Sequence, residues 1–150
     1  KGGDTYFANM YMALDEMPIA LREQIEGLRA TFRYGGRSAE RNLRLEKDDQ
    51  DKPLQDHPIV KTHRESGRES LFVNPTHTIG ILGLEDELGQ TLLHEVYEWA
   101  GQERFQACHV WRPGDTVIWD NRCCWHSATG ENPLRQPRRF YRSTIADRTH

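Results

Sequence analysis

The run from Trp119 to His126 is the densest group of side chains that could do chemistry. It reads Trp-Asp-Asn-Arg-Cys-Cys-Trp-His, and three arginines, Arg138, Arg139 and Arg142, follow it. A histidine that closes a β run can offer a neutral ring nitrogen to a metal ion. Arginines on a neighbouring strand can hold an anion with paired hydrogen bonds. The pattern therefore allows a metal ligand beside an anion clamp.

Each of these features alone also has a simpler interpretation. A histidine among aromatic residues is more often a hydrogen-bonded structural residue, and arginines at a strand end are usually solvated or paired with carboxylates. The five histidines between residues 57 and 109 have no metal-ligand spacing with one another, and we interpret each as structural or solvent-exposed. The three cysteines are odd in number and lack paired spacing, which indicates reduced thiols on strands: Cys108, Cys123 and Cys124.

Composition limits the class of protein. A chain of 150 residues with 36% hydrophobic residues is long enough for one compact domain. The formal charge of −3, with acidic and basic residues interspersed, favours a small-molecule partner over nucleic acid or an anionic membrane. No stretch approaches about 18 apolar residues, and no apolar signal-peptide core follows Lys1, so we expect a cytoplasmic protein. Assembly into a homo-oligomer is compatible with this composition.

The first half of the chain predicts helices and a loop. Apolar residues between Thr5 and Ala30 fall at mixed three- and four-residue spacing, which predicts two short helices. Pro18 should open the second helix, because proline is tolerated in a first turn. Residues 33–56 are rich in charge and glycine and predict a mobile surface loop.

The remainder predicts a mainly β architecture with helices packed outside it. Residues 59–63 and 70–74 flank a turn at 65–67 and predict a hairpin. Residues 85–102 predict a helix capped by Gly101, with one apolar face formed by Leu88, Leu92, Leu93, Val96 and Trp99. Three further runs predict strands: 105–111, 116–119 and 139–145.

The order of the motifs resembles the taurine/2,4-D dioxygenase family of Fe(II)- and 2-oxoglutarate-dependent dioxygenases, with this chain as the C-terminal part. The chain opens within a motif rather than with Met, so we expect a fragment. The matching segments extend from end to end: Gly2-Gly3-Asp4-Thr5, Phe7-Ala8-Asn9-Met10, His57-Pro58-Ile59-Val60, Thr62-His63, Ser66-Gly67-Arg68, Leu71-Phe72-Val73-Asn74, Gly114-Asp115, Trp119-Asp120-Asn121-Arg122, His126, and 138–145.

The resemblance implies a single dioxygenase catalytic domain over residues 1–150, with a double-stranded β-helix (jelly-roll) core that is incomplete at the N-terminus. Such enzymes hold Fe(II) by two histidines and one carboxylate, leaving positions for 2-oxoglutarate and O₂. The distal histidine matches His126, which would be the catalytic metal ligand. The family takes its other two ligands from a His-x-Asp/Glu motif upstream of Gly-Gly-Asp-Thr, before this chain begins.

The resemblance also implies which residues hold the co-substrate. Thr5 and Arg138 match the partners of the distal carboxylate of 2-oxoglutarate, and Arg139 is the alternative if the register slips by one. A guanidinium and a hydroxyl suit that task, because both donate hydrogen bonds to a carboxylate. Trp119 would pack beside the cofactor pocket, with a purely structural aromatic as the alternative.

Three further residues are expected at the primary substrate. Arg142 matches the arginine that faces the anionic group of the substrate, although a second structural arginine fits equally well. Phe72 and Tyr34 lie where the family presents pocket-lining aromatic residues. The expected reaction is hydroxylation of a small, anionic organic substrate with formation of succinate and CO₂.

Two other classes of protein compete with this interpretation. The first is a non-catalytic jelly-roll binding module that has lost the iron site, but such a module would not need both the Gly-Asp-Thr motif and Arg138. The second is a metalloenzyme of the cupin kind, which would usually show a tighter His-x-His cluster than this sequence contains.

Overall fold

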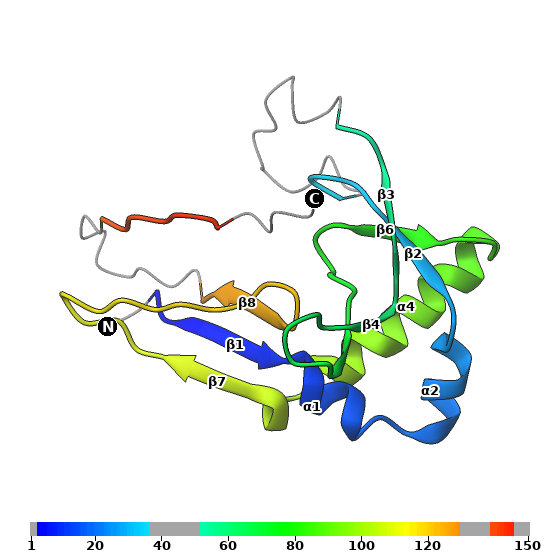
Figure 1. The fold of residues 1–150 in the computed structure, drawn as a ribbon, viewed down its shortest axis with the longest axis horizontal. Helices are drawn as coiled ribbons and strands as arrows, with labels where there is room; N and C mark the ends of the chain where they lie inside the picture. The colour runs from blue at the N-terminus through cyan, green and yellow to red at the C-terminus, as the bar shows by residue number, and fades with distance from the viewer. Residues whose placement is uncertain (1–2, 37–51, 130–138, 146–150) are drawn as a thin grey trace.

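The computed structural model describes residues 3–36, 52–129 and 139–145 and is built mainly from short antiparallel strands with few helices (Figure 1). In the first sheet, β1 (Thr5–Asn9) lies between β7 (Gln106–His109) and β8 (Cys124–Ala128). In the second, β2 (Arg29–Phe32) lies between β3 (Gln55–Pro58) and β6 (Thr78–Ile81). A separate hairpin pairs β4 (Val60–Thr62) with β5 (Glu69–Leu71).

The helices connect and cover these strands. They are α1 (Met10–Asp15), α2 (Ile19–Ile25), α4 (Asp86–Ala100) and a 3₁₀ turn at Glu103–Phe105. Figure 1 shows the sheet of β7, β1 and β8 on one side of the molecule, with α4 behind the hairpin and the second sheet on the other. Across the described ranges, no helix is both long and apolar enough to cross a membrane.

The predicted helix at the start of the chain is partly wrong. Residues Thr5–Asn9 form β1, which pairs with β7 on one side and β8 on the other. The helix begins only at Met10, because the Asn9 side-chain oxygen accepts hydrogen bonds from the backbone N–H groups of Tyr11 and Met12. Pairing on both edges outweighs a local spacing that was compatible with a helix. The prediction that Pro18 opens the next helix is confirmed.

The loop and strand predictions have mixed outcomes. The hairpin is confirmed, and Gly67 adopts a positive φ of 68° in its turn. The expected loop over 33–56 extends too far, because β3 begins at Gln55 and pairs with β2. Its middle, residues 37–51, lies outside the described residues.

Two predicted strands are wrong. Residues 116–119 and 139–145 have no regular structure, although their composition is typical of strands. A strand forms only where a partner accepts and donates its backbone hydrogen bonds, and the described residues supply no such partner for these two segments. The segment 105–111 is confirmed as the region of β7. The sequence interpretation missed β2 and β6.

The hydrophobic core lies where α1 and α4 meet the hairpin and the second sheet. Its largest fully buried apolar side chains come from every part of the chain up to α4: Met10, Leu14, Ile25, Ile59, Leu71, Leu93 and Val96. The indole N–H of Trp99 donates to the backbone oxygen of Ala13 at 2.7 Å and joins α4 to α1. The predicted apolar face of α4 is correct except at Leu88, which is 58% exposed.

The two leucines of α4 provide a test of this packing. Replacing Leu93, which is 1% exposed, with alanine should lower the free energy of unfolding by about 2–5 kcal/mol, because a cavity remains in a close-packed core. Leu88→Ala makes the same chemical change at an exposed site of the same helix and should cost less than about 0.5 kcal/mol. Urea unfolding of both variants measures the difference, and equal losses would contradict the packing.

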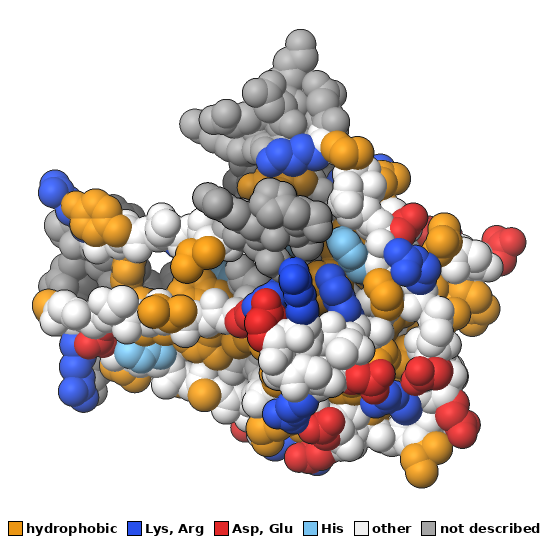
Figure 2. Space-filling model, in the orientation of Figure 1, with side chains coloured by type: hydrophobic (Ala, Val, Ile, Leu, Met, Phe, Trp, Pro, Cys, Tyr) orange, Lys and Arg blue, Asp and Glu red, His pale blue; other side chains and the backbone are white. Residues whose placement is uncertain are grey.

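The surface shows no single-sign patch on the face drawn in Figure 2. Basic and acidic side chains are interspersed around α2 and the hairpin. Several of them form ion pairs, including Arg22 with Glu69 and Arg68 with Asp15, both at 2.8 Å. Because these pairs are largely exposed, they contribute little to stability.

Candidate metal and co-substrate site

His126 lies on β8 directly opposite Phe7 of the neighbouring strand β1. Directly opposed residues project to the same face of an antiparallel sheet, and residues two apart along a strand share that face. Thr5, which is two residues before Phe7, therefore shares a face with His126. The register thus places the predicted metal ligand, His126, and the predicted co-substrate hydroxyl, that of Thr5, on the same face of the sheet.

The ring of His126 is held by aromatic contacts rather than by hydrogen bonds. Its centroid lies 4.9 Å from that of Trp119 and 6.4 Å from that of Phe7, and Phe7 packs on Trp119 at 5.4 Å. Within the described part of the chain, neither ring nitrogen of His126 makes a hydrogen bond. Partial burial and, to a smaller extent, the positive charge of Arg142 lower the pKa of His126 below its usual value.

These properties fit a metal ligand. A histidine binds metal through a neutral ring nitrogen, and a lowered pKa keeps the ring neutral at physiological pH. Aromatic packing on the ring restricts its orientation without occupying its nitrogens. Among the residues that the structure describes, however, no group of three or more potential ligands includes His126. His126 can therefore supply one ligand of a metal site whose other ligands these residues do not provide.

A pocket of about 440 Å³ opens beside His126, and we call it the Arg142 pocket. It unites three of the residues expected from the sequence: His126, Phe72 and Arg142. Polar and apolar side chains contribute to its wall in nearly equal measure, and convergent polar groups of this kind can orient a small molecule. The remaining lining residues are Met10, Phe32, Leu71, Val73, Asn74, Thr76, His77, Asn121, Cys124 and Trp125.

Phe72 belongs to a small aromatic cluster in this wall. Its ring lies 5.7 Å from that of Phe32 and 5.1 Å from that of His57, and the Lys61 ammonium sits 4.3 Å above it. Tyr34 is one layer further out. It stacks on the pocket-lining ring of His77 at 5.7 Å and is itself 49% exposed. The structure therefore brings Phe72 to the pocket and leaves Tyr34 at its margin.

Thr5 has a partner that the sequence interpretation missed. The indole N–H of Trp111 donates to the Thr5 hydroxyl oxygen at 2.9 Å. A hydroxyl that accepts one hydrogen bond still has its own proton to donate, so Trp111 leaves Thr5 able to donate to a carboxylate. Trp111 is held in turn by edge-on contacts with His109 at 4.7 Å and Phe140 at 5.1 Å. Arg138, the other predicted carboxylate partner, lies outside the described residues.

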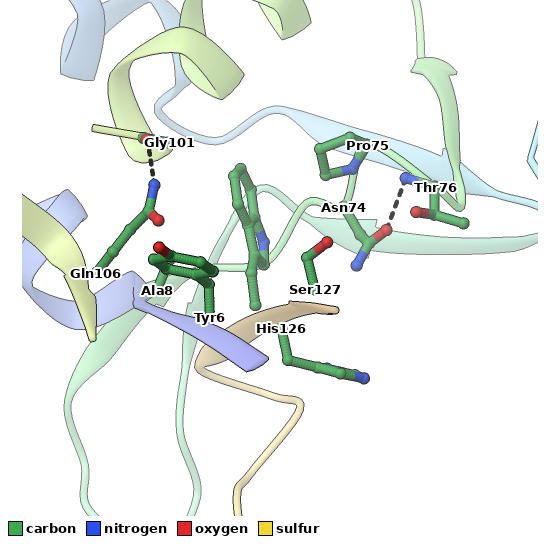
Figure 3. A pocket seen from close by; sticks show the side chains of 10 residues that line it. Tyr6, Ala8, Asn74, Pro75, Thr76, Gly101, Gln106, His126 and Ser127 are labelled. Atoms are coloured by element: carbon green, nitrogen blue, oxygen red, sulfur yellow. Dashed lines mark hydrogen bonds between the residues drawn. The ribbon is translucent and has the colours of Figure 1, made fainter. Parts of the chain in front are cut away.

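A second pocket, of about 300 Å³, lies against the opposite face of the first sheet (Figure 3). Its lining includes Tyr6, Ala8 and Ser127, which alternate along β1 and β8 with the residues of the His126 face. Figure 3 shows the His126 side chain pointing away from Tyr6 and Ser127. His126 is nevertheless among the residues that line this pocket, so this residue borders both pockets.

One group of potential metal ligands lies elsewhere in the described residues. Ligand atoms of His63, Asp120 and Cys123 all fall within 4.8 Å of one another. Hydrogen bonds already engage the first two: both Asp120 oxygens accept from the Arg122 guanidinium, and the His63 Nδ1 accepts from the backbone N–H of Ser66 at 3.3 Å. The positive guanidinium beside Asp120 also disfavours a cation. We interpret the group as a hydrogen-bond network.

The cysteines behave as the sequence predicts for reduced thiols. All three are free, with Cys108 on β7 and Cys124 on β8, whereas Cys123 immediately precedes β8. Burial raises the pKa of Cys124 to about 11 and also raises that of Cys123. Both thiols therefore stay protonated and unreactive at neutral pH.

Comparison with known proteins shows which family this chain resembles. Residues 1–144 match the family model described as taurine catabolism dioxygenase TauD, TfdA family. The chain is 38% identical over 136 residues to the alpha-ketoglutarate-dependent 2,4-dichlorophenoxyacetate dioxygenase of Cupriavidus pinatubonensis, covering 84% of this chain and 44% of that protein. It is 34% identical over 153 residues to the (S)-phenoxypropionate/alpha-ketoglutarate-dioxygenase of Sphingobium herbicidovorans, covering 97% and 53%.

A solved structure is similar as well. The crystal structure of AAD-2 in complex with Mn(II) and N-oxalylglycine superposes with a TM-score of 0.78 at 30% identity, covering 92% of this chain and 55% of that one. The chain thus spans about half the length of the relatives it matches. The family match extends over nearly all of this chain and agrees with the resemblance seen in its motifs. The chain belongs to the TauD/TfdA family of dioxygenases.

Proposed function

We propose that the chain is the C-terminal part of an Fe(II)- and 2-oxoglutarate-dependent dioxygenase that hydroxylates a small, anionic organic substrate and forms succinate and CO₂. The observation that carries the proposal is the aromatic-packed ring of His126 in the lining of a pocket that also contains Arg142. Residues 1–150 would form part of a single catalytic domain. The sheet of β7, β1 and β8 would be one wall of its jelly-roll core.

Each residue of the site then has a task that its surroundings support. His126 would supply one of three iron ligands, with the other two from the upstream His-x-Asp/Glu motif typical of the family. Thr5, oriented by Trp111, would donate to the distal carboxylate of 2-oxoglutarate together with Arg138. Bound iron and 2-oxoglutarate supply the oxidising chemistry, and the polypeptide supplies position and charge.

The primary substrate would occupy the Arg142 pocket. Arg142 would attract its anionic group, and Phe72 would pack against its carbon skeleton. Trp119 would keep the ring of His126 in place and limit access of water to one side of it. The partner is thus a small molecule, and neither nucleic acid nor a membrane is needed for this activity.

The test is succinate formation by the full-length natural protein supplied with Fe(II), 2-oxoglutarate and O₂. Some succinate should form without primary substrate, and more should form with an anionic substrate that fits the pocket. Phenoxyacetates and short alkylsulfonates are reasonable first candidates, because the two differ in size and share a negative charge. A folded protein that forms no succinate under any of these conditions would instead support the non-catalytic binding module.

A further inference from the structure

The turn that precedes β8 is closed by the carboxylate of Asp120. Its Oδ1 accepts the backbone N–H of Arg122 at 2.9 Å, which closes the local turn. The Arg122 guanidinium also donates to both carboxylate oxygens, with 2.6 Å between Nη2 and Oδ2. One side chain thus determines both the backbone and the side-chain conformation of the turn. This guanidinium holds the pKa of Asp120 far below its usual range.

The β4–β5 hairpin holds the same carboxylate from the other side. His63 Nε2 lies 3.1 Å from Asp120 Oδ2, and the His63 side chain is only 9% exposed. Because His63 Nδ1 accepts from Ser66, the ring proton of a neutral His63 resides on Nε2, which therefore donates to Asp120. Arg122 Nη1 also reaches Glu65 Oε2 at 2.8 Å. Two residues of the hairpin turn thus anchor the turn before β8.

Two further hydrogen bonds hold the backbone carbonyl groups of the same turn. The buried hydroxyl of Ser70 donates to the backbone oxygen of Arg122 at 3.3 Å. The backbone N–H of Met10, the first residue of α1, donates to the backbone oxygen of Cys123 at 3.0 Å. The turn is therefore attached both to the hairpin and to the core helix α1.

Both ends of this turn lead to the ring of His126. Trp119, directly before Asp120, packs on that ring, and β8 carries His126 itself three residues beyond Cys123. A shift of the turn would move the histidine and the aromatic residue that orients it. We infer that Asp120, held by His63, is a positioning residue that aims His126 into the Arg142 pocket. This inference rests on the proposed function for its catalytic consequence.

The test compares four variants in the full-length protein. Asp120→Asn removes the negative charge that Arg122 binds. It also places an amide N–H group, itself a donor, where Arg122 and His63 need an acceptor. His63→Ala removes the hairpin anchor, whereas His63→Gln can restore it, because a glutamine amide can donate from nearly the same place. Asp15→Asn is the matched control, since it makes the same chemical change in an exposed ion pair with Arg68.

The first measurement is the dissociation constant for Co(II), an unreactive substitute for Fe(II), in the presence of 2-oxoglutarate. We expect about 10-fold weaker binding in Asp120→Asn and His63→Ala, a value typical of residues that orient metal ligands. His63→Gln should recover most of the affinity, and Asp15→Asn should match the wild type. Co(II) binding within twofold of the wild type in a folded Asp120→Asn or His63→Ala protein would overturn the inference.

The second measurement needs neither metal nor turnover. Backbone amides of residues 124–126 should exchange hydrogen faster in metal-free Asp120→Asn and His63→Ala, with α4 unchanged. Unchanged exchange at 124–126 in His63→Ala would count against the positioning role even if Asp120→Asn failed to fold. A wild-type protein that binds no Co(II) and forms no succinate would refute the proposed function instead, and the exchange result would still decide whether the turn is held this way.

Discussion

His126→Ala should abolish succinate formation in the full-length protein and remove measurable Fe(II) or Co(II) binding, while the fold remains largely intact. One of three protein ligands would be lost, and a site with two ligands holds a labile divalent ion poorly against water. The fold should persist because His126 is an exposed residue. Within the described residues its ring makes no hydrogen bond and contacts only other rings. Metal binding by calorimetry and a urea unfolding curve separate the two effects.

His94→Ala is the matched control for this experiment. His94 lies on α4 with its side chain 74% exposed and only a 4.0 Å contact to Glu98, so its loss should change neither activity nor metal affinity. The same chemical change is thereby made at a surface position away from the site. Full activity in His126→Ala would refute the assignment of the metal ligand. Equal losses in both variants would indicate general damage to the protein.

Local patterns predicted the elements that depend on local interactions. The 15 residues of α4 show helical spacing over several turns, and the structure confirms them. Turn residues between two β-like runs likewise indicated the β4–β5 hairpin. The failures depend on distant partners. Thr5 to Asn9 is a strand because β7 and β8, about a hundred residues later, pair with it, and 116–119 lacks a partner among the described residues.

The same distinction explains which site residues could be found. His126, Phe72 and Arg142 were placed by motif resemblance, and the structure brings them to one pocket. The Trp111–Thr5 and His63–Asp120 hydrogen bonds join residues 106 and 57 positions apart, so no local pattern could indicate them. Thr5, His63 and Asp120 lie within the matched motifs and Trp111 lies outside them, but the motifs do not indicate which of these residues contact one another. His63, which the sequence analysis interprets as structural, thus contacts the segment that carries His126.

The second large effect separates co-substrate from substrate at the arginines that follow β8. Arg138→Ala should raise the apparent Michaelis constant for 2-oxoglutarate roughly ten- to a hundred-fold, because a hydrogen bond to a charged group contributes about 1.5–3 kcal/mol. Arg142→Ala should weaken the primary substrate instead, because Arg142 lines the pocket beside His126. Succinate formation measured with and without primary substrate distinguishes the two, since the substrate-independent reaction requires only iron, 2-oxoglutarate and O₂.

Arg139→Ala completes the comparison, because Arg139 adjoins Arg138 and is itself exposed. It should leave both Michaelis constants near the wild-type values. A large 2-oxoglutarate defect in Arg139→Ala alone would show that the co-substrate arginine is one position later than proposed. Equal defects in all three variants would mean that the arginines support the local structure rather than divide two ligands between them. A loss of substrate-independent succinate in Arg142→Ala would place that arginine at the co-substrate as well, because no primary substrate is present in that reaction.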